Sequence, residues 1–380
     1  MSLSLYNWLN RTMVIERLAG VGTFTLVLIV ACMLLMNART SKRVNLIFNM
    51  YLVILCVLAF FYYPGTTADL LRLRAYGESW IKLEFGTFFK SYVATSSTPV
   101  SQLFIYFCSL TNVDGVLPMA CALVYYGNAF YIFKDLYNRH NYSAKSLAIA
   151  LLFLMSTGNF VLIISNVRTF AALAIVARCF YDETINGKPI IWNALWYLIA
   201  GLSHSIALVA CALRFLWLLF AGTQSIYIKI RNILVVAAVF AAVYFLGQKY
   251  IDAAINKALG YLEEEVYSFG WSYLISGIVV FVALLTCIGR YQNITPELKD
   301  MRGYILTVVA TACVFAFEYS IFHRLTLFSS LLMVPYLAKR IDTAKKNNFA
   351  ILVCFCALAM LAVSVTRGDL SGYKFFLANW

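Results

Sequence analysis

The sequence IIWNALWYLIAGLSHSIALVACALRFLWLLF occupies residues 190–220 and is almost entirely apolar. One helix of this length would extend about 47 Å, which exceeds the ~30 Å hydrocarbon core of a bilayer. The polar segment Gly201–Ser205, with the sequence GLSHS, interrupts the stretch near its middle. The stretch therefore predicts two short membrane spans, 190–202 and 204–220, joined at a polar apex.

The composition of the whole chain extends this interpretation to all 380 residues. Hydrophobic residues make up 62% of the chain and charged residues only 12%, about half the ~25% of an average soluble domain. A soluble fold would lack a charged surface, and the apolar content is too high for a disordered chain. We therefore predict an all-α polytopic integral membrane protein that forms a single transmembrane domain over residues 1–380.

Apolar runs separated by short charged gaps predict about twelve transmembrane helices. They lie near 18–36, 44–63, 115–134, 146–164, 168–182, 190–202, 204–220, 232–247, 271–289, 303–318, 322–338 and 349–365. A shorter apolar piece, 100–112, is too brief to cross the core and is predicted to be re-entrant or interfacial. Two outer loops are long, 64–98 and 248–270. The first mixes basic and aromatic residues, which suits a segment lying in the headgroup layer.

The distribution of charge predicts the orientation in the membrane. Alternate gaps carry 18 basic and 6 acidic residues on one side, against 12 basic and 11 acidic residues on the other. Because Lys and Arg concentrate in cytoplasmic loops, the first side is predicted to be cytoplasmic and both termini to lie outside the cytoplasm. The same bias accounts for the formal net charge of +13, so no nucleic acid is expected as a partner.

Metal, disulfide and nucleotide chemistry find no support in the sequence. All ten cysteines lie within or beside apolar runs and form no C-x-x-C pair, which is typical of small buried hydrophobes. The chain also lacks D-x-D, H-E-x-x-H, P-loop and G-x-S-x-G motifs. We therefore expect neither a metal nor another cofactor.

Three polar groups lie where a membrane span should be apolar, all toward the outer face. The first is Ser165–Arg168, predicted to be a tight turn between two spans. A charge inside the core costs ~2.5–3.5 kcal/mol on insertion scales. Arg168 either reaches outer lipid phosphates or faces a cavity, and both interpretations stay open.

The second group is the Gly201–Ser205 apex, with His204 at its centre. A lone histidine is usually structural, capping a helix or bonding a carbonyl. We favour a functional role for His204, in an outer depression open to water. The third group is Glu318–Arg324. Glu318 and Arg324 form a structural ion pair, or Arg324 faces the same cavity as Arg168; both alternatives stay open.

These groups converge on one chemistry. Two guanidinium groups can grip a diphosphate through forked hydrogen bonds. A neutral imidazole can take a proton from a hydroxyl near neutral pH. Together they predict glycosyl transfer from a lipid diphosphate donor.

The order and spacing of four segments resemble the Wzy-type polysaccharide polymerases, and in particular their EpsG-like branch. The segments are DLLRLRAYG (Asp69–Gly77), ISNVRTFAALA (Ile164–Ala174), GLSHSIAL (Gly201–Leu208) and HRLTLFSSLLMVPYL (His323–Leu337). One departure is that Leu73 stands where the family's first motif has tyrosine, with Tyr76 three residues further on. Asp69 is therefore a safer functional residue than Tyr76.

The resemblance implies a glycosyltransferase C-like membrane fold in the bacterial inner membrane, with the active site facing the periplasm. The enzyme would join undecaprenyl-diphosphate-linked oligosaccharide repeat units into O-antigen, capsule or exopolysaccharide. Membrane lipids, a chain-length regulator and a flippase are its implied partners. The proposed catalytic residues are Arg168, His204 and Arg324. The proposed substrate-binding residues are Asp69, Arg72, Arg74, Asn166, Ser203, Glu318 and His323.

Three rival functions remain. An O-antigen ligase would use similar chemistry with another acceptor. A flippase or transporter of lipid-linked sugar should carry polar residues near the midplane on broken, repeated helices, whereas the polar groups here gather at one face. A membrane-bound acyltransferase would more naturally take its donor from the cytoplasm, and His204 faces away from it.

Overall fold

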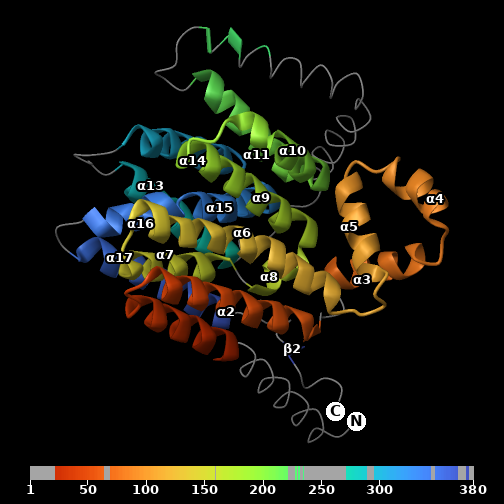
Figure 1. Cartoon of the computed structure of the whole chain (residues 1–380), viewed down its shortest axis with the longest axis horizontal. Helices are drawn as coiled ribbons and strands as arrows, with labels where there is room; N and C mark the ends of the chain where they lie inside the picture. Colours follow the sequence, from red (N-terminus) through yellow and green to blue (C-terminus); the bar gives the residue numbers. More distant parts are fainter. Residues whose placement is uncertain are drawn as a thin grey trace, which may run out of the picture. The chain divides into compact units, whose positions relative to one another are not determined.

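The computed structural model describes residues 22–63, 69–158, 160–220, 271–288, 295–343, 347–366 and 374–375, with five positions between 227 and 234. Within these residues the chain is almost wholly helical, as predicted, and the exception is a pair of two-residue strands (Figure 1). The predicted span 232–247 lies mostly, and the outer loop 248–270 entirely, outside the described residues.

The chain divides into two compact units. Unit 1 comprises residues 1–82, 105–171 and 337–380, and unit 2 comprises residues 83–104 and 172–336. Each unit is described separately below.

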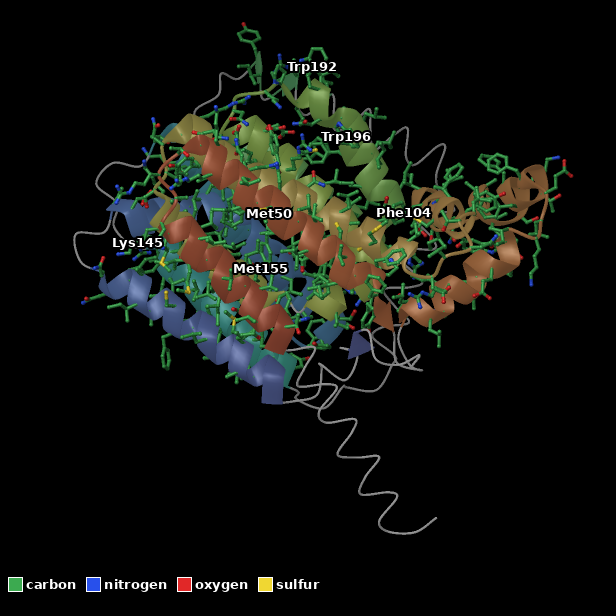
Figure 2. All side chains as sticks on the ribbon, turned by 60° about the horizontal axis from the view of Figure 1, so that its bottom comes forward. Met50, Phe104, Lys145, Met155, Trp192 and Trp196 are labelled. Carbon is green, nitrogen blue, oxygen red and sulfur yellow. The ribbon has the colours of Figure 1, made fainter. Side chains whose placement is uncertain are left out.

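Unit 1 is built on two long helices, α2 (Ser41–Phe60) and α6 (Val116–His140), which pack against each other (Figure 1). Thr40 caps α2 by accepting a hydrogen bond from the Arg43 amide, as N-cap threonines do. Phe48 and Tyr51 lie on the buried face of α2 and pack against Phe130 of α6, with ring centroids 5.2 and 5.4 Å away. Residues on the opposite face, such as Met50, are also apolar but exposed (Figure 2). A helix that is apolar on both faces suits a lipid environment.

The other helices of unit 1 complete its core. α7 (Ala144–Thr157) packs against α17 (Asn348–Thr366), and α8 (Phe160–Ser165) packs against α6 and α3 (Asp69–Trp80). Asp342 at the end of α16 (Val334–Thr343) accepts hydrogen bonds from the amide and hydroxyl of Ser143, the N-cap of α7. Strand β1 (Tyr62–Tyr63) pairs antiparallel with β2 (Lys374–Phe375), which ties the end of α2 to the C-terminal segment.

Unit 2 contains α10 (Ile190–Ser203), α11 (Ser205–Phe220), α13 (Trp271–Ile288), α14 (Pro296–Val314) and α15 (Tyr319–Leu332). It also holds most of α9 (Val167–Thr184). α14 packs on α11, α13 and α15, while α10 packs on α11. Trp192 and Trp196 project from α10 with 72% and 51% of their surface exposed, as lipid-facing side chains would (Figure 2).

One glycine sets the approach of α11 to α14. A Cβ on Gly303 would collide with the ring of Trp217, so the indole packs directly on the α14 backbone. Its ring N–H then donates a hydrogen bond to Asp300, and the hydroxyl of Tyr304 donates to the carbonyl of Ala210 at 2.8 Å. These two hydrogen bonds hold α14 against α11.

The described residues include two helices long and apolar enough to cross a membrane, α2 and α6. A third candidate is the pair α15 and α16, bent by 50° at Met333. Shorter apolar helices cover the predicted spans at 18–36, 146–164, 190–202, 204–220, 271–289 and 349–365.

Several predicted boundaries need correction. The span at 146–164 is broken between α7 and α8, because Gly158 departs from helical geometry with ψ of 96°. The span at 322–338 is broken at Met333, and α14 begins at Pro296, earlier than 303. The outer loop 64–98 is largely helical, since α3, α4 (Phe85–Phe88) and the π-helix η1 (Phe89–Val93) occupy it. The piece at 100–112 contains the short helix α5 (Pro99–Ser109), and its re-entrant or interfacial placement stays a prediction.

Candidate functional site

An ion pair in unit 1 joins the first two predicted motifs. Asp69, at the start of α3, lies 3.9 Å from the guanidinium of Arg168, in the first turn of α9. The same carboxylate also binds Arg72 one turn along α3. The side chains of Asp69 and Arg168 are 27% and 22% exposed, so both stay within reach of solvent or a ligand. Two arginines around one carboxylate leave this cluster with a formal charge of +1.

Arg74 lies on another face of α3 and is buried, with 8% of its surface exposed. Its guanidinium lies 3.8 Å from the carboxylate of Asp114, which precedes α6. Tyr62 of β1 lies within electrostatic range of Arg74 and next to Ser165, the last residue of α8. The α3 helix, β1 and the end of α8 therefore meet around Arg74.

The segment between α8 and α9 is a bend at one residue, Asn166. The Asn166 amide and side chain both donate to the carbonyl of Leu162, at 3.0 and 3.2 Å. Its own carbonyl accepts from the amides of Thr169 and Phe170, which starts α9 immediately. Asn166 thus holds the bend, and Arg168 emerges from a rigid helix start.

A cavity of about 240 Å³ lies in unit 1, with Arg74 in its wall. Its lining comes from the second half of α3, the end of α5, the following loop and the start of α6. The lining residues are Arg74, Glu78, Cys108, Ser109, Asn112, Val113, Asp114 and Leu117.

His204 separates α10 from α11 and has extended backbone angles, φ −160° and ψ 140°. Its Nδ1 accepts a hydrogen bond of 3.2 Å from the amide of Ile206, so the ring caps α11. His204 is 5% exposed, and the prediction that it lies open to water is therefore wrong. The apex is a single extended residue inside a close helix junction, which leaves little room for solvent. Ser203 donates its hydroxyl back to the carbonyl of Ile199 at 2.7 Å.

The third polar group forms the start of α15. Glu318 is the N-cap and accepts a hydrogen bond of 2.7 Å from the Ile321 amide. Within the described residues no ion pair joins Glu318 to Arg324, so the predicted alternative of a structural pair is wrong. His323 is buried, lies 2.9 Å from the Ser276 hydroxyl of α13 and stacks on Tyr319 with ring centroids 5.3 Å apart. Arg324 is half-buried beside it.

The predicted site residues thus fall into two sets. Unit 1 holds Asp69, Arg72, Arg74, Asn166 and Arg168. Unit 2 holds Ser203, His204, Glu318, His323 and Arg324. The structure brings Arg72 and Arg74 of α3 close to the bend at Ser165–Arg168. It also places Glu318 and His323 together at the start of α15.

Sequence reasoning missed the residues that complete the polar surroundings of Arg74. Tyr62, Glu78 and Asp114 belong to none of the four motifs. Tyr62 lies in the predicted span 44–63, and only Glu78 and Asp114 lie in predicted outer gaps, where their position could have indicated them.

Sequence reasoning also missed a buried ion network in unit 2, at the predicted cytoplasmic side. Arg214 donates to Glu183 at 3.2 Å and to Asp300 at 3.4 Å, and its guanidinium lies over Phe180. Among the described residues, no group of three or more His, Cys, Asp or Glu side chains is arranged to hold a metal ion.

Comparison with known proteins adds one finding. The sequence model of the EpsG family matches residues 79–377, more than three quarters of the chain. The matched region contains Arg168, His204 and Arg324 and begins after Asp69, Arg72 and Arg74. No curated protein and no solved structure matches the chain.

Proposed function

Because the chain belongs to the EpsG family, we propose that it polymerises a surface polysaccharide. The proposed substrate is an oligosaccharide repeat unit carried on undecaprenyl diphosphate in the bacterial inner membrane. The bond between the donor's anomeric carbon and its diphosphate oxygen breaks, and a bond to a hydroxyl of the acceptor unit forms. The lipid diphosphate leaves with the bonding electrons, and the hydroxyl proton passes to it or to water.

The observation that carries this proposal is the cluster of Asp69, Arg72 and Arg168. It joins segments about 100 residues apart, it carries net positive charge, and its side chains are partly exposed. Two guanidinium groups on rigid helix starts can form the paired hydrogen bonds that phosphate oxygens accept. In this proposal Arg168 holds the donor diphosphate and stabilises the charge that develops as it leaves. Asp69 aligns the two arginines.

The geometry at His204 favours an orienting role over that of a base. Its Nδ1 accepts from the Ile206 amide, so in the neutral ring the proton resides on Nε2. Nε2 is then a hydrogen-bond donor, and it could act as a base only if the cap of α11 were given up. We therefore propose that His204 helps to orient the substrate and does not take its proton. Arg324, beside His323 at the start of α15, is proposed as a further cation that attracts the phosphate groups of the substrate.

The contacts within each unit support the proposed placement of this chemistry on the outer side. Asp69–Arg168, Arg74–Asp114 and the β1–β2 pair each join two segments predicted to be outer. Ser143–Asp342 and Arg214–Asp300 each join two segments predicted to be cytoplasmic. We propose on this basis about twelve spans in a glycosyltransferase C-like arrangement with a periplasmic active site.

The test is polymerisation by purified protein in liposomes that contain lipid-linked repeat units and EDTA, with products separated on a gel. Three variants of His204 distinguish its role as the helix cap of α11 from its proposed role in orienting the substrate. Asparagine can keep the cap on Ile206, because it is a strong N-cap residue, but it lacks the distal N–H. Glutamine can keep a distal N–H, and alanine keeps neither.

We expect a ladder from the wild type, a weakened ladder from His204→Gln, and none from His204→Asn or His204→Ala. A normal ladder from His204→Asn would reduce His204 to a helix cap. Absence of any ladder from the wild type, with lipid-linked units moved across the bilayer instead, would replace the polymerase by a flippase.

A further inference from the structure

The cavity around Arg74 differs in charge from the cluster of Asp69, Arg72 and Arg168. Its lining contains one cation, Arg74, and two anions, Glu78 and Asp114, so its formal charge is −1. The cluster of Asp69, Arg72 and Arg168 has a formal charge of +1. A phosphate would be attracted to the cluster and repelled by the rim of the cavity.

The cavity also offers the mixture of groups that a polyhydroxylated ring requires. The carboxylates of Glu78 and Asp114 accept hydrogen bonds, the guanidinium of Arg74 donates them, and Ser109 and Asn112 can do both. Val113 and Leu117 add apolar surface, against which the carbon face of a ring can lie. The volume of about 240 Å³ is below the ~300–1,000 Å³ of drug-sized pockets, so it suits one ring rather than a long oligosaccharide.

The walls of the cavity are held in place before any ligand binds. A Cβ on Gly77 would collide with the Ser109 side chain, so α3 and α5 are in direct contact there. The loop after α5 is closed by a hydrogen bond of 3.0 Å from the Asn112 amide to the Ser109 carbonyl. Asn112 itself has φ of 54°, a left-handed conformation that asparagine tolerates. A binding site built this way loses little conformational entropy on binding.

We propose that this cavity is a monosaccharide subsite, which holds one sugar ring of the lipid-linked repeat unit while the arginine cluster holds the diphosphate. The identity of the ligand rests on the proposed function. On α3, Asp69 and Arg72 lie on one side and Arg74 and Glu78 on the opposite side, at about 100° per residue. Phosphate and sugar would therefore be bound by different faces of one helix, and the specificity for the ring would come from Glu78, Asn112 and Asp114.

The test measures protection of a cysteine in the cavity wall. Val113 lines the cavity and is 46% exposed, so a Val113→Cys variant should react with an impermeant maleimide. The site of labelling is mapped by peptide mass spectrometry, because the chain has ten cysteines of its own. Two probes are compared: the repeat-unit oligosaccharide released from the lipid of the source cells, and inorganic pyrophosphate.

We expect the oligosaccharide to slow labelling and pyrophosphate to leave it unchanged. Introducing Glu78→Gln or Asp114→Asn should raise the half-protecting concentration about tenfold, since each removes a charged acceptor. Asn112→Gly should do the same, because glycine adopts φ near 54° and keeps the loop while the amide is lost. Glu84→Gln, an exposed acid outside the eight lining residues, is the matched control and should have no effect.

Each outcome separates this inference from the proposed function. Polymerisation in liposomes without protection by the oligosaccharide would overturn the subsite and leave the polymerase intact. Protection by pyrophosphate, or unchanged protection in the Asn112→Gly variant, would also overturn the subsite. Protection that is weakened by all three variants in a protein without polymerase activity would support a sugar site in a protein of another function.

Discussion

Replacing Arg168 by lysine should remove most of the polymerase activity and leave the protein folded. Lysine keeps the positive charge but presents a single ammonium group instead of a planar fork. Loss of one preorganised donor to a developing negative charge typically costs about 10²–10³ in kcat. At 1.36 kcal/mol for each factor of ten, that is roughly 3–4 kcal/mol of transition-state stabilisation.

The structure limits the accompanying loss of stability. Arg168 forms an ion pair with Asp69, at 3.9 Å and with both side chains about a quarter exposed. Pairs of this kind contribute ~0.2–1 kcal/mol to the free energy of unfolding. Loss of this pair should therefore lower the melting temperature by about 2–4 °C at most.

The assay compares ladder formation in liposomes with the melting temperature of the same preparations in detergent. Arg178→Lys is the matched control, because it makes the same substitution ten residues further along α9, at the predicted cytoplasmic end. We expect full activity from the control. If the Arg168→Lys variant keeps more than half of the wild-type rate, the forked contact with phosphate is refuted. If the activity falls and the melting temperature also falls by more than about 4 °C, Arg168 is a structural residue.

Further predictions concern the orientation in the membrane, the Cys108 thiol and the buried ion pair of Arg214. A cysteine at Val113 should react with an impermeant maleimide in intact cells, whereas one at Thr343 should not; the reverse result would invert the predicted orientation. Burial raises the pKa of the Cys108 thiol to about 11, so its labelling should accelerate with rising pH up to that value. At pH 8 it should be about two orders of magnitude slower than that of an ordinary cysteine, and equal rates would show an open thiol. Arg214→Met should destabilise the protein by about 3–5 kcal/mol, because Glu183 is left buried without its cation, and adding Glu183→Gln should restore part of the loss. Calorimetry in detergent measures both variants, and an unchanged melting temperature for Arg214→Met would contradict the buried pair.

The membrane class and most helix positions could be predicted from the sequence because both depend on local composition. Apolar runs bounded by charges give α2 and α6 to within a few residues, apart from the C-terminal extension of α6 to His140. Breaks inside runs could not be predicted in the same way. Met333 lies in an apolar stretch, and only the packing around it shows where the helix stops. Gly158 lies in the polar sequence STGN at residues 156–159, a turn signal that the predicted span 146–164 did not take into account.

The candidate site was predictable in its arginines and not in their neighbours. A charge in an apolar context is conspicuous, so Arg168 and Arg324 could be identified from position alone. Asp114 and Glu78 are ordinary outer residues in the sequence, and their importance arises from the fold, which places them around the buried Arg74. The position of His204 between two helices could be predicted from the polar apex, but its burial could not, because one extended residue between two helices gives no sequence signal for burial.

The helix α3 has a consequence for the size of the substrate that can be accepted. Arg72 and Glu78 are six residues apart, so their positions along the helix axis differ by about 9 Å, a distance that the helix itself fixes. If the proposed sites are correct, α3 therefore fixes the distance between a group that binds phosphate and a group that binds a sugar ring. A residue inserted between Arg72 and Glu78 would rotate one side chain by about 100° around the helix axis relative to the other. Each binding group would keep its own chemistry, but the two could no longer bind the same substrate together. Related proteins that bind repeat units of different geometry could therefore differ in the number of residues between these two positions of α3, while the residue types at the two positions stay the same.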